Sequence, residues 1–566
     1  MPTISFSHAD LQTLLGRSAS LPDIEAWLPL VKGELKDYLS STGELRVELQ
    51  DSNRPDLWCV EGIARQIRIA LTNTPPVYPF WSTKGRIKRR VLVLPETESV
   101  RPYIAACGAV GYQVTEAGLT QLIQTQEKLA EIFGRKRQTV SIGIYRLSPL
   151  AFPLTYGLVK PTEVRFTPLG FSEKMTLEEI LAVHPKGVEY GHILSGHEKF
   201  PLFWDKEGQI LSFPPIINSR DIGEVRVGDT DLLLEVTGTD LRMVLLTLNI
   251  LATNLADRGA SIEPVDVVYP YATEVGTIVR TPFNIARPQR VRASEIERAL
   301  GMALGTEAIE AALRSYGHHV KATRHTLSVT PPPYRDDLMH AVDVAEDVAI
   351  SRGYDAFQPL MPTQFTVGAL SQIEQLSDQI RTLMIGFGFQ EIFSNILMAR
   401  DELIERMRLT ESEHEAVVEV ANPLSLSYAC LRSAILPCLL RVEATSPRAF
   451  YPHKLFEIGE VASPDPRAEL GSETKTHLAL LLASATANFS EIHAVLDVLL
   501  YYLLKTYRLE PIVHPSYLEG RVGQIVYEGQ AIGVIGELHP EVLEAWQITM
   551  PIAAVELHCD KLISPA

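Results

Sequence analysis

Four acidic side chains follow three consecutive prolines, Pro331–Pro333. Asp343, Glu346 and Asp347 stand at positions i, i+3 and i+4, so a helix would place their carboxylates on one face. Asp337 precedes them on the incoming loop and can fold back over that face. Like charges this close repel unless a cation neutralises them, and hard oxygen donors suit Mg²⁺. The alternative is a solvated acidic helix start, which spacing alone slightly favours because acids are common in the first turn.

A second stretch with possible chemistry is the loop between Ser212 and Asn218, which a Pro-Pro pair stiffens. About a dozen residues later, Leu232–Asp240 reads as a strand. Glu235, Thr237 and Thr239 would then line one face of that strand, opposite the stiffened loop. Hydroxyls and a carboxylate in this arrangement suit a small polar pocket. The alternative is a half-exposed strand whose polar residues face water.

The elements that must position these residues mix helices and strands, which predicts an α+β multidomain protein. The acidic stretch itself reads as a helix with an apolar stripe of Val342, Ala345, Val348 and Ala349. Other helices are predicted at Leu119–Phe133, Leu177–Val183, Leu241–Asn254, Ala293–Leu300, Thr306–Tyr316 and Leu376–Ile385. Strands are predicted at Arg90–Leu94, Thr139–Tyr145, Leu327–Val329, Gln524–Tyr527, Ala531–Ile535 and Ala553–Leu557.

Composition limits the classes of function. The chain of 566 residues is long enough for three to four domains, and 46% of it is apolar without an unbroken run of transmembrane length. Five scattered cysteines form no CxxC motif, which predicts neither a zinc knuckle nor a disulfide framework and indicates a reducing cytosol. The net charge of −17 argues against a general nucleic-acid binder. Basic clusters at residues 84–90 and 135–137 read as solvated surface, although either could touch a phosphate backbone.

A search for familiar reaction motifs finds no nucleophile elbow, Walker loop or dinucleotide fingerprint. Near the end of the chain, Arg432, Glu457, Arg521 and Glu537 lie in tight glycine-containing or apolar segments. Scattered Arg and Glu residues of this kind are usually structural ion pairs. Residue types alone therefore predict one cation or partner site and one pocket, without a substrate.

Taken in order, the motifs resemble those of the beta subunits of phenylalanyl-tRNA synthetase, in the shorter archaeal and eukaryotic form. The resemblance runs nearly from end to end. The segments that carry it are Asn53–Leu57, Glu61–Arg65, Pro168–Phe171, His184–Gly187, Ser212–Asn218, Val236–Asp240, Pro333–Tyr354, Asn422–Ser425, Glu519–Gly523 and Gly536–Pro540. Each is weak by itself, and their order makes the set specific.

The resemblance implies an (αβ)₂ heterotetramer in the cytoplasm that attaches phenylalanine to tRNA(Phe) with ATP. The alpha subunit would bind ATP and carry the synthetic active site, so this chain would have no catalytic residue for aminoacylation. The implied domains are an N-terminal α+β domain (1–85), a B3/B4-type editing domain (86–278), a winged-helix-like B5 domain (279–357) and a class II catalytic-like antiparallel-sheet domain (358–566). The last would be inactive and form the interface with the alpha subunit.

Carried over by position, the resemblance implies that Asp337, Asp343, Glu346 and Asp347 hold Mg²⁺ at the interface with the alpha subunit. It also assigns Ser212, Glu235 and Thr237 to a pocket that hydrolyses tyrosine wrongly attached to tRNA(Phe). The extra tRNA-binding module and the anticodon-binding domain of the longer bacterial subunit are expected to be missing. The alternatives are a stand-alone tRNA-editing hydrolase and a non-catalytic RNA-binding scaffold with the same fold.

Overall fold

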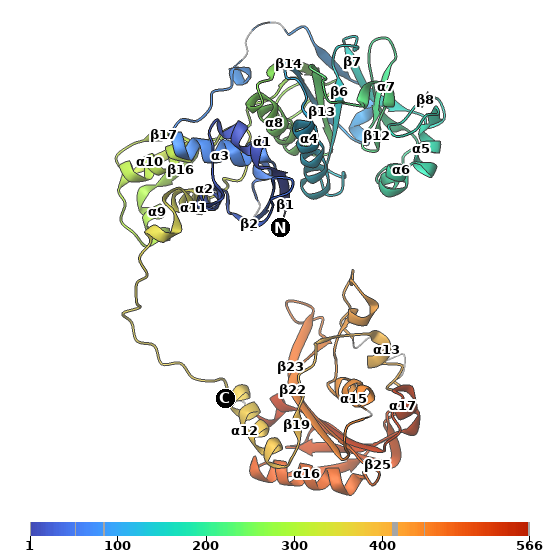
Figure 1. Cartoon of the computed structure of the whole chain (residues 1–566). Helices are drawn as coiled ribbons and strands as arrows, with labels where there is room; N and C mark the ends of the chain where they lie inside the picture. The colour runs from blue at the N-terminus through green and yellow to red at the C-terminus, as the bar shows by residue number, and fades with distance from the viewer. Residues whose placement is uncertain are drawn as a thin grey trace. The chain divides into compact units, whose positions relative to one another are not determined.

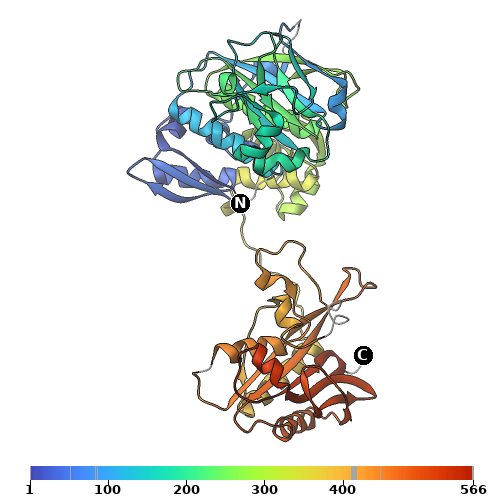
Figure 2. The ribbon, with the colours of Figure 1, turned by 90° about the vertical axis from the view of Figure 1, so that its right-hand side faces the viewer.

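The computed structural model describes residues 2–50, 53–82, 85, 87–409, 417–446 and 448–563. The chain divides into two compact units, Met1–Leu360 and Met361–Ala566 (Figures 1 and 2). Each unit has its own sheets and its own hydrophobic core. In the described parts of the chain, no helix is long and apolar enough to cross a membrane.

The first unit begins with a small antiparallel sheet in the order β1-β3-β2. Its strands are β1 (Thr3–Ser7), β2 (Gly33–Leu39) and β3 (Glu44–Leu49), and the helices beside them are α1 (His8–Leu15), α2 (Leu21–Trp27) and α3 (Val60–Thr72). Leu11, Leu14 and Leu15 form the buried face of α1, and the helix ends at Gly16, whose φ of 69° suits a residue without a side chain.

The largest sheet of the described residues has ten strands, in the order β12-β11-β10-β7-β4-β14-β5-β13-β6, with β15 paired to β14. These strands are β4 (Arg90–Val93), β5 (Tyr103–Val110), β6 (Val140–Arg146), β7 (Leu154–Val159), β10 (Phe200–Trp204), β11 (Ile210–Phe213), β12 (Ile217–Asn218), β13 (Leu232–Gly238), β14 (Ser261–Val268) and β15 (Ile278–Thr281). β15 belongs to this sheet, which therefore extends past the boundary predicted at residue 278.

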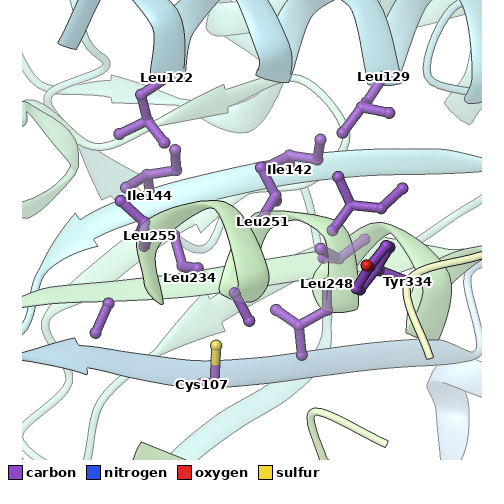
Figure 3. Close-up of a cluster of buried hydrophobic side chains, with 14 of the residues drawn as sticks. Cys107, Leu122, Leu129, Ile142, Ile144, Leu234, Leu248, Leu251, Leu255 and Tyr334 are labelled. Atoms are coloured by element: carbon purple, nitrogen blue, oxygen red, sulfur yellow. The ribbon is translucent and has the colours of Figure 1, made fainter. Parts of the chain in front are cut away.

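Helices cover the β6 end of the large sheet. Leu122 of α4 (Glu116–Lys128) and Leu129, which begins the π-helical turn after it (Leu129–Phe133), point toward Ile142 and Ile144 of β6 (Figure 3). Other helices of this region are α5 (Leu177–Val183), α6 (Pro185–Tyr190), α7 (Arg220–Gly223) and α8 (Leu241–Asp257), and a two-stranded sheet joins β8 (Arg165–Phe166) to β9 (Met175–Thr176). α8 is buried along most of its length because leucines occupy nearly every turn.

One continuous hydrophobic cluster joins the small sheet, the large sheet and α8. Buried ion pairs reinforce this contact. Arg258, at the end of α8, binds Asp10 and Glu61, and Arg65 of α3 binds Asp257 at 2.6 Å. The N-terminal sheet and the large sheet therefore share one core, although a boundary between them was predicted at residue 85.

A third sheet of the first unit has the order β16-β18-β17, with β16 (Gln289–Arg292), β17 (His319–Ala322) and β18 (Thr326–Thr330). It packs with α9 (Ala293–Leu300), α10 (Thr306–Ser315) and α11 (Ala341–Arg352). α11 is the predicted acidic helix. Its buried apolar residues are Val344, Ala345, Val348, Ala349 and Ile350, whereas Val342 is exposed, so the predicted apolar stripe was wrong at that residue.

The second unit is built on a mostly antiparallel sheet in the order β19-β22-β23-β27-β26-β25-β24. Its strands are β19 (Gln390–Glu391), β22 (His453–Pro464), β23 (Ser472–Ala483), β24 (Tyr507–Pro511), β25 (Tyr517–Tyr527), β26 (Gln530–Leu538) and β27 (Ile552–His558). Leu478 and Leu480 face α12 (Gln372–Gly386) and α16 (Phe489–Tyr502), while Leu481 faces α15 (Leu436–Thr445) and α17 (Pro540–Ala545). This alternation is the period of two expected of a strand buried on both faces. The unit also contains α13 (Arg400–Leu403) and the pair β20 (Leu397–Met398) and β21 (Cys430–Leu431).

Candidate active site

A cavity of about 250 Å³ lies where β6, β13, α4 and the loop after β11 meet. Two of the predicted residues, Ser212 and Glu235, line it, so the fold brings together side chains from separate parts of the sequence. Its other lining residues are Ile123, Gln126, Glu127, Ala130, Arg137, Ser141, Ile142, Gly143, Leu169, Lys186, Phe213, Pro214, Pro215, Ile216, Ile217 and Asn218. The volume suits one small side chain or ring system rather than a nucleotide.

Glu235 lies on β13 between two neighbouring strands and is only 2% exposed. The Tyr145 hydroxyl lies 2.6 Å from Oε2 of Glu235 and 2.8 Å from the Ser212 Oγ. A phenol has one proton and a carboxylate only accepts, so the phenol donates to Glu235 and the serine hydroxyl can donate to the phenol oxygen. Three polar groups are thus linked at the wall of the cavity.

The protonation of Glu235 is unusual for a carboxyl group. Burial raises the pKa of Glu235 to about 7, while the Tyr145 hydroxyl, the Arg101 guanidinium and the Thr237 hydroxyl oppose that rise. Its second oxygen, Oε1, is buried and makes no hydrogen bond. A buried acceptor without a partner is costly, and such groups mark sites where a ligand completes the structure. Glu235 is therefore the best candidate in the cavity for binding a polar group of a ligand.

Thr237 lies two residues after Glu235 on β13, and the contacts of its hydroxyl give it a different role. Its hydroxyl lies 2.8 Å from the Ser141 Oγ and accepts a hydrogen bond of 3.1 Å from Nε of the buried Arg101. Arg101 also donates to backbone carbonyls of Arg137 and Thr237, and burial lowers the pKa of Arg101 to about 10. Thr237 is therefore not one of the residues that line the cavity, and its hydroxyl binds the buried guanidinium of Arg101.

The structure changes two further predictions about this region. Thr239 follows the end of β13 and is exposed, so it does not share a lining face with Glu235. The alternative of a half-exposed strand is also wrong, because every residue of β13 is buried.

One member of the basic cluster at 135–137 does not belong to the solvated surface. The guanidinium of Arg137 donates to the carbonyls of Pro215 and Ile216 at 3.2 and 2.8 Å and lies 4.3 Å from the ring centre of Tyr190. It holds the loop that forms one wall of the cavity. No local pattern in the sequence indicates this role, or the roles of Tyr145 and Arg101.

The four predicted metal ligands lie near the start of α11. Arg335 binds both Asp337, at 2.6 Å, and Asp347, at 2.8 Å, and all three side chains are buried. Asp347 also accepts a hydrogen bond of 2.7 Å from His318. Burial alone would raise the pKa of Asp347, but Arg335 and His318 outweigh it and hold that pKa well below its usual range.

The other two acids, Asp343 and Glu346, each have a different partner. Asp343 accepts hydrogen bonds from the backbone N–H groups of Met339 and His340 at 2.7 and 2.6 Å, which caps the helix. Glu346 pairs with Lys32 of the N-terminal region at 2.6 Å. Asp337, Glu346 and Asp347 border one very small cavity, and Asp343 lies outside its lining.

This arrangement does not fit a dication held by all four carboxylates, because each of them already has a cationic or amide partner within the chain. In the described ranges, no three His, Cys, Asp or Glu side chains gather as a metal-binding group.

Two known protein families match consecutive parts of the chain. The family described as "tRNA synthetase B5 domain" matches residues 289–354, which contain α9 to α11 and the third sheet. The family described as "Phenylalanyl tRNA synthetase beta chain CLM domain" matches residues 358–559, nearly the whole second unit. Both descriptions indicate an aminoacyl-tRNA synthetase.

Relatives match along almost the whole chain. The phenylalanine–tRNA ligase beta subunit of Treponema pallidum is 41% identical over 526 residues, covering 92% of this chain and 87% of the relative. That of Borrelia hermsii is 37% identical and covers 100% of both chains, and that of the archaeon Thermococcus kodakarensis is 37% identical over 98% of both. The chain belongs to the family of phenylalanine–tRNA ligase beta subunits.

A solved structure supports the fold of the first unit. The N-terminal fragment of the phenylalanyl-tRNA synthetase beta subunit from Pyrococcus horikoshii is 38% identical, with a TM-score of 0.59. The match covers 62% of this chain and all of that fragment.

Proposed function

We propose that this chain acts as the beta subunit of a cytoplasmic phenylalanine–tRNA ligase, an (αβ)₂ enzyme that attaches phenylalanine to tRNA(Phe). ATP and the synthetic active site belong to the alpha subunit in this proposal. The observation that carries it is the match to beta subunits over the full length of the chain, at 37% identity to a relative of the same extent. The second unit is then a class II catalytic-like domain without synthetic activity, and residues 279–357 form a winged-helix-like domain.

Within this enzyme, the chain hydrolyses tyrosine wrongly attached to tRNA(Phe). A site shaped for phenylalanine cannot strongly reject a side chain that merely adds a hydroxyl, so a second site must test for that hydroxyl. The cavity beside Glu235 supports this role. It is small, it is lined by Ser212 and Glu235, and Oε1 of Glu235 is a buried acceptor without a partner. The hydroxyl of a tyrosyl group would supply the missing hydrogen bond.

The test of editing is deacylation of tyrosyl-tRNA(Phe) by the complex of this chain with its alpha subunit. The Glu235→Ala variant should lose about 10- to 100-fold in that rate, since a hydrogen bond to a charged group contributes about 1.5–3 kcal/mol. Phenylalanine charging should be unchanged. Equal deacylation by the wild type and the variant would remove Glu235 from the site.

Support for a protein partner comes from apolar side chains on the second unit. Phe393, Leu424, Leu426 and Phe450 are each at least 82% exposed, and Tyr428 is 47% exposed. Contiguous exposed apolar patches mark interaction surfaces, and Leu424, Leu426 and Tyr428 lie within one five-residue stretch. We assign this surface to the alpha subunit.

Co-expression with an alpha subunit tests the assembly. The double variant Leu424→Asp, Leu426→Asp should elute as the free chain in size-exclusion chromatography, because burying two carboxylates in an apolar interface is costly. The matched control is Val227→Asp, a change at an exposed apolar residue of the first unit, which should co-elute with the alpha subunit. A double variant that assembles normally would contradict the assignment, and a wild-type chain that deacylates tyrosyl-tRNA alone would favour a stand-alone hydrolase.

The magnesium site stays a prediction, and we propose that two of the four carboxylates, rather than all four, bind the ion. Mg²⁺ usually takes one or two carboxylates and completes its shell with water. Asp343 and Glu346 are half-buried, whereas the side chains of Asp337 and Asp347 are buried against Arg335. Asp343 and Glu346 would be the first ligands, and a cation at Glu346 would have to displace Lys32.

A further inference from the structure

The pairing of β13 with β6 explains how Tyr145 reaches Glu235. In the antiparallel register, Glu235 lies opposite Gly143 and Leu233 lies opposite Tyr145. Residues directly opposite in such a pair point to the same side of the sheet, and diagonal neighbours are within reach of a long aromatic side chain. Tyr145 therefore shares a face with Glu235, and its hydroxyl reaches diagonally across to Oε2.

Gly143 makes this diagonal contact possible. A Cβ atom at residue 143 would collide with the Tyr145 hydroxyl and with Oε2 of Glu235. On the other side of β13, the residue opposite Glu235 is the small Ala106. The absence of a side chain at residue 143 therefore leaves room for the hydrogen bond between the phenol of Tyr145 and the carboxylate of Glu235.

The two oxygens of Glu235 have different surroundings. Oε2 accepts the phenol proton of Tyr145, while Oε1 is buried without a hydrogen bond in a side chain that borders the cavity. A carboxylate bound by only one oxygen cannot rotate freely without losing that bond. Tyr145 thus determines which oxygen is left for a ligand.

We propose that Tyr145 is a positioning residue for substrate discrimination: it holds Oε2 of Glu235 so that Oε1 accepts the hydroxyl of a tyrosyl group. This inference rests on the proposed editing function and adds a residue and an atom to it. The ligand is a para-hydroxyphenyl side chain carried as an ester. A phenylalanyl ester leaves Oε1 unpaired and is bound less well.

Tyr145→Phe removes the hydroxyl and keeps the ring. The measurement is the ratio of deacylation rates of tyrosyl- and phenylalanyl-tRNA(Phe) across pH, with the chain in complex with its alpha subunit. In the wild type the ratio should rise through pH 7, as Glu235 ionises. In the variant the carboxylate loses a hydrogen bond that favours ionisation, so the midpoint should move up by about one pH unit. A merely structural loss would lower both rates at every pH and leave the midpoint unchanged.

Two variants and a spectroscopic measurement complete the test. Gly143→Ala displaces the same phenol by collision and should shift the midpoint in the same direction. The matched control is Tyr269→Phe, which removes another buried phenol hydroxyl, bonded to the carbonyl of Ile104, and should leave the midpoint unchanged. Infrared titration of the carboxyl band, identified by its loss in Glu235→Gln, reads the ionisation of Glu235 without any substrate.

The outcomes separate the two proposals. An upward shift in both Tyr145→Phe and Gly143→Ala, but not in Tyr269→Phe, supports the positioning role. An active wild type and a Tyr145→Phe variant with the same midpoint would overturn that role and leave editing standing. A wild-type complex that shows no preference for tyrosyl-tRNA(Phe) would overturn editing, and the role of Tyr145 with it.

Discussion

Arg335 and Asp347 form a buried ion pair of 2.8 Å at the start of the acidic helix α11. Because Arg335 also binds Asp337, a single guanidinium neutralises two of the four carboxylates that the sequence suggested as metal ligands. These carboxylates contribute to the stability of the first unit whether or not a cation binds nearby.

Replacing Arg335 with Met should destabilise the first unit strongly. The change leaves two buried carboxylates without their cation, which costs about 3–5 kcal/mol for a broken buried pair. Urea unfolding monitored on this unit measures the effect. Arg242→Met provides the matched control, because Arg242 pairs with Asp336 at an exposed position, where such pairs contribute about 0–1 kcal/mol. Equal losses in the two variants would show that burial of the Arg335 pairs adds nothing.

The stability of the first unit should fall in acid through Asp347. The folded-state pKa of Asp347 is depressed, so its contribution is fully present above the unfolded pKa of about 3.9 and is lost as the pH falls toward the folded pKa. Melting temperatures measured below about pH 4 should decline more steeply in the wild type than in Asp347→Asn. Parallel curves would exclude Asp347 as a source of acid sensitivity.

Lys32 should compete with divalent cations for Glu346. In Lys32→Met the carboxylate loses its ion pair, so Mn²⁺, used as a paramagnetic probe for the magnesium site, should bind the assembled enzyme about two- to fivefold more tightly, given about 0–1 kcal/mol for a partly exposed pair. Glu346→Gln should abolish this binding. If neither variant changes Mn²⁺ affinity, Glu346 is not a ligand.

Thr237 should matter more for stability than for deacylation. Thr237→Val leaves Nε of Arg101 without its side-chain acceptor and removes one of the two buried contacts of the Ser141 hydroxyl, which still accepts from Arg101, at a cost of about 1–3 kcal/mol. Thr237→Ser keeps the hydroxyl and should recover most of that loss in urea unfolding. The deacylation defect of Thr237→Val should be smaller than that of Glu235→Ala. The opposite order would give Thr237 a direct role in binding the substrate.

The sequence predicted local elements better than contacts between distant residues. The helix predicted at Leu241–Asn254 is confirmed as part of α8, and the strand at Thr139–Tyr145 is confirmed as part of β6, because their apolar periodicity is strong. Tyr145 and Glu235 lie 90 residues apart, and their contact depends on the register of β6 against β13. No local pattern encodes that register.

In the candidate sites, too, single residues were easier to predict than the distant partners that hold them. Ser212 and Glu235 stand out both from the loop and strand pattern and from the resemblance to a family. Nothing local indicates Tyr145, which contacts both of them, or Arg137, which holds the neighbouring loop. Arg137 reads locally as part of a basic surface run, and only the folded loop at 215–216 explains why it turns inward. Similarly, the partner of Glu346 is Lys32, far away in the sequence.

The contacts of Arg258 with Asp10 and Glu61 have a consequence for how such proteins diversify. A genetic exchange with its crossover near residue 85, between genes that differ at these positions, would leave buried charges of the hybrid protein without their partners. Crossovers near residue 360, where the two units join, avoid that penalty. Inheritance in this lineage should therefore carry the first 360 residues as one block, and comparison of gene trees for the two segments on either side of residue 85 would reveal it.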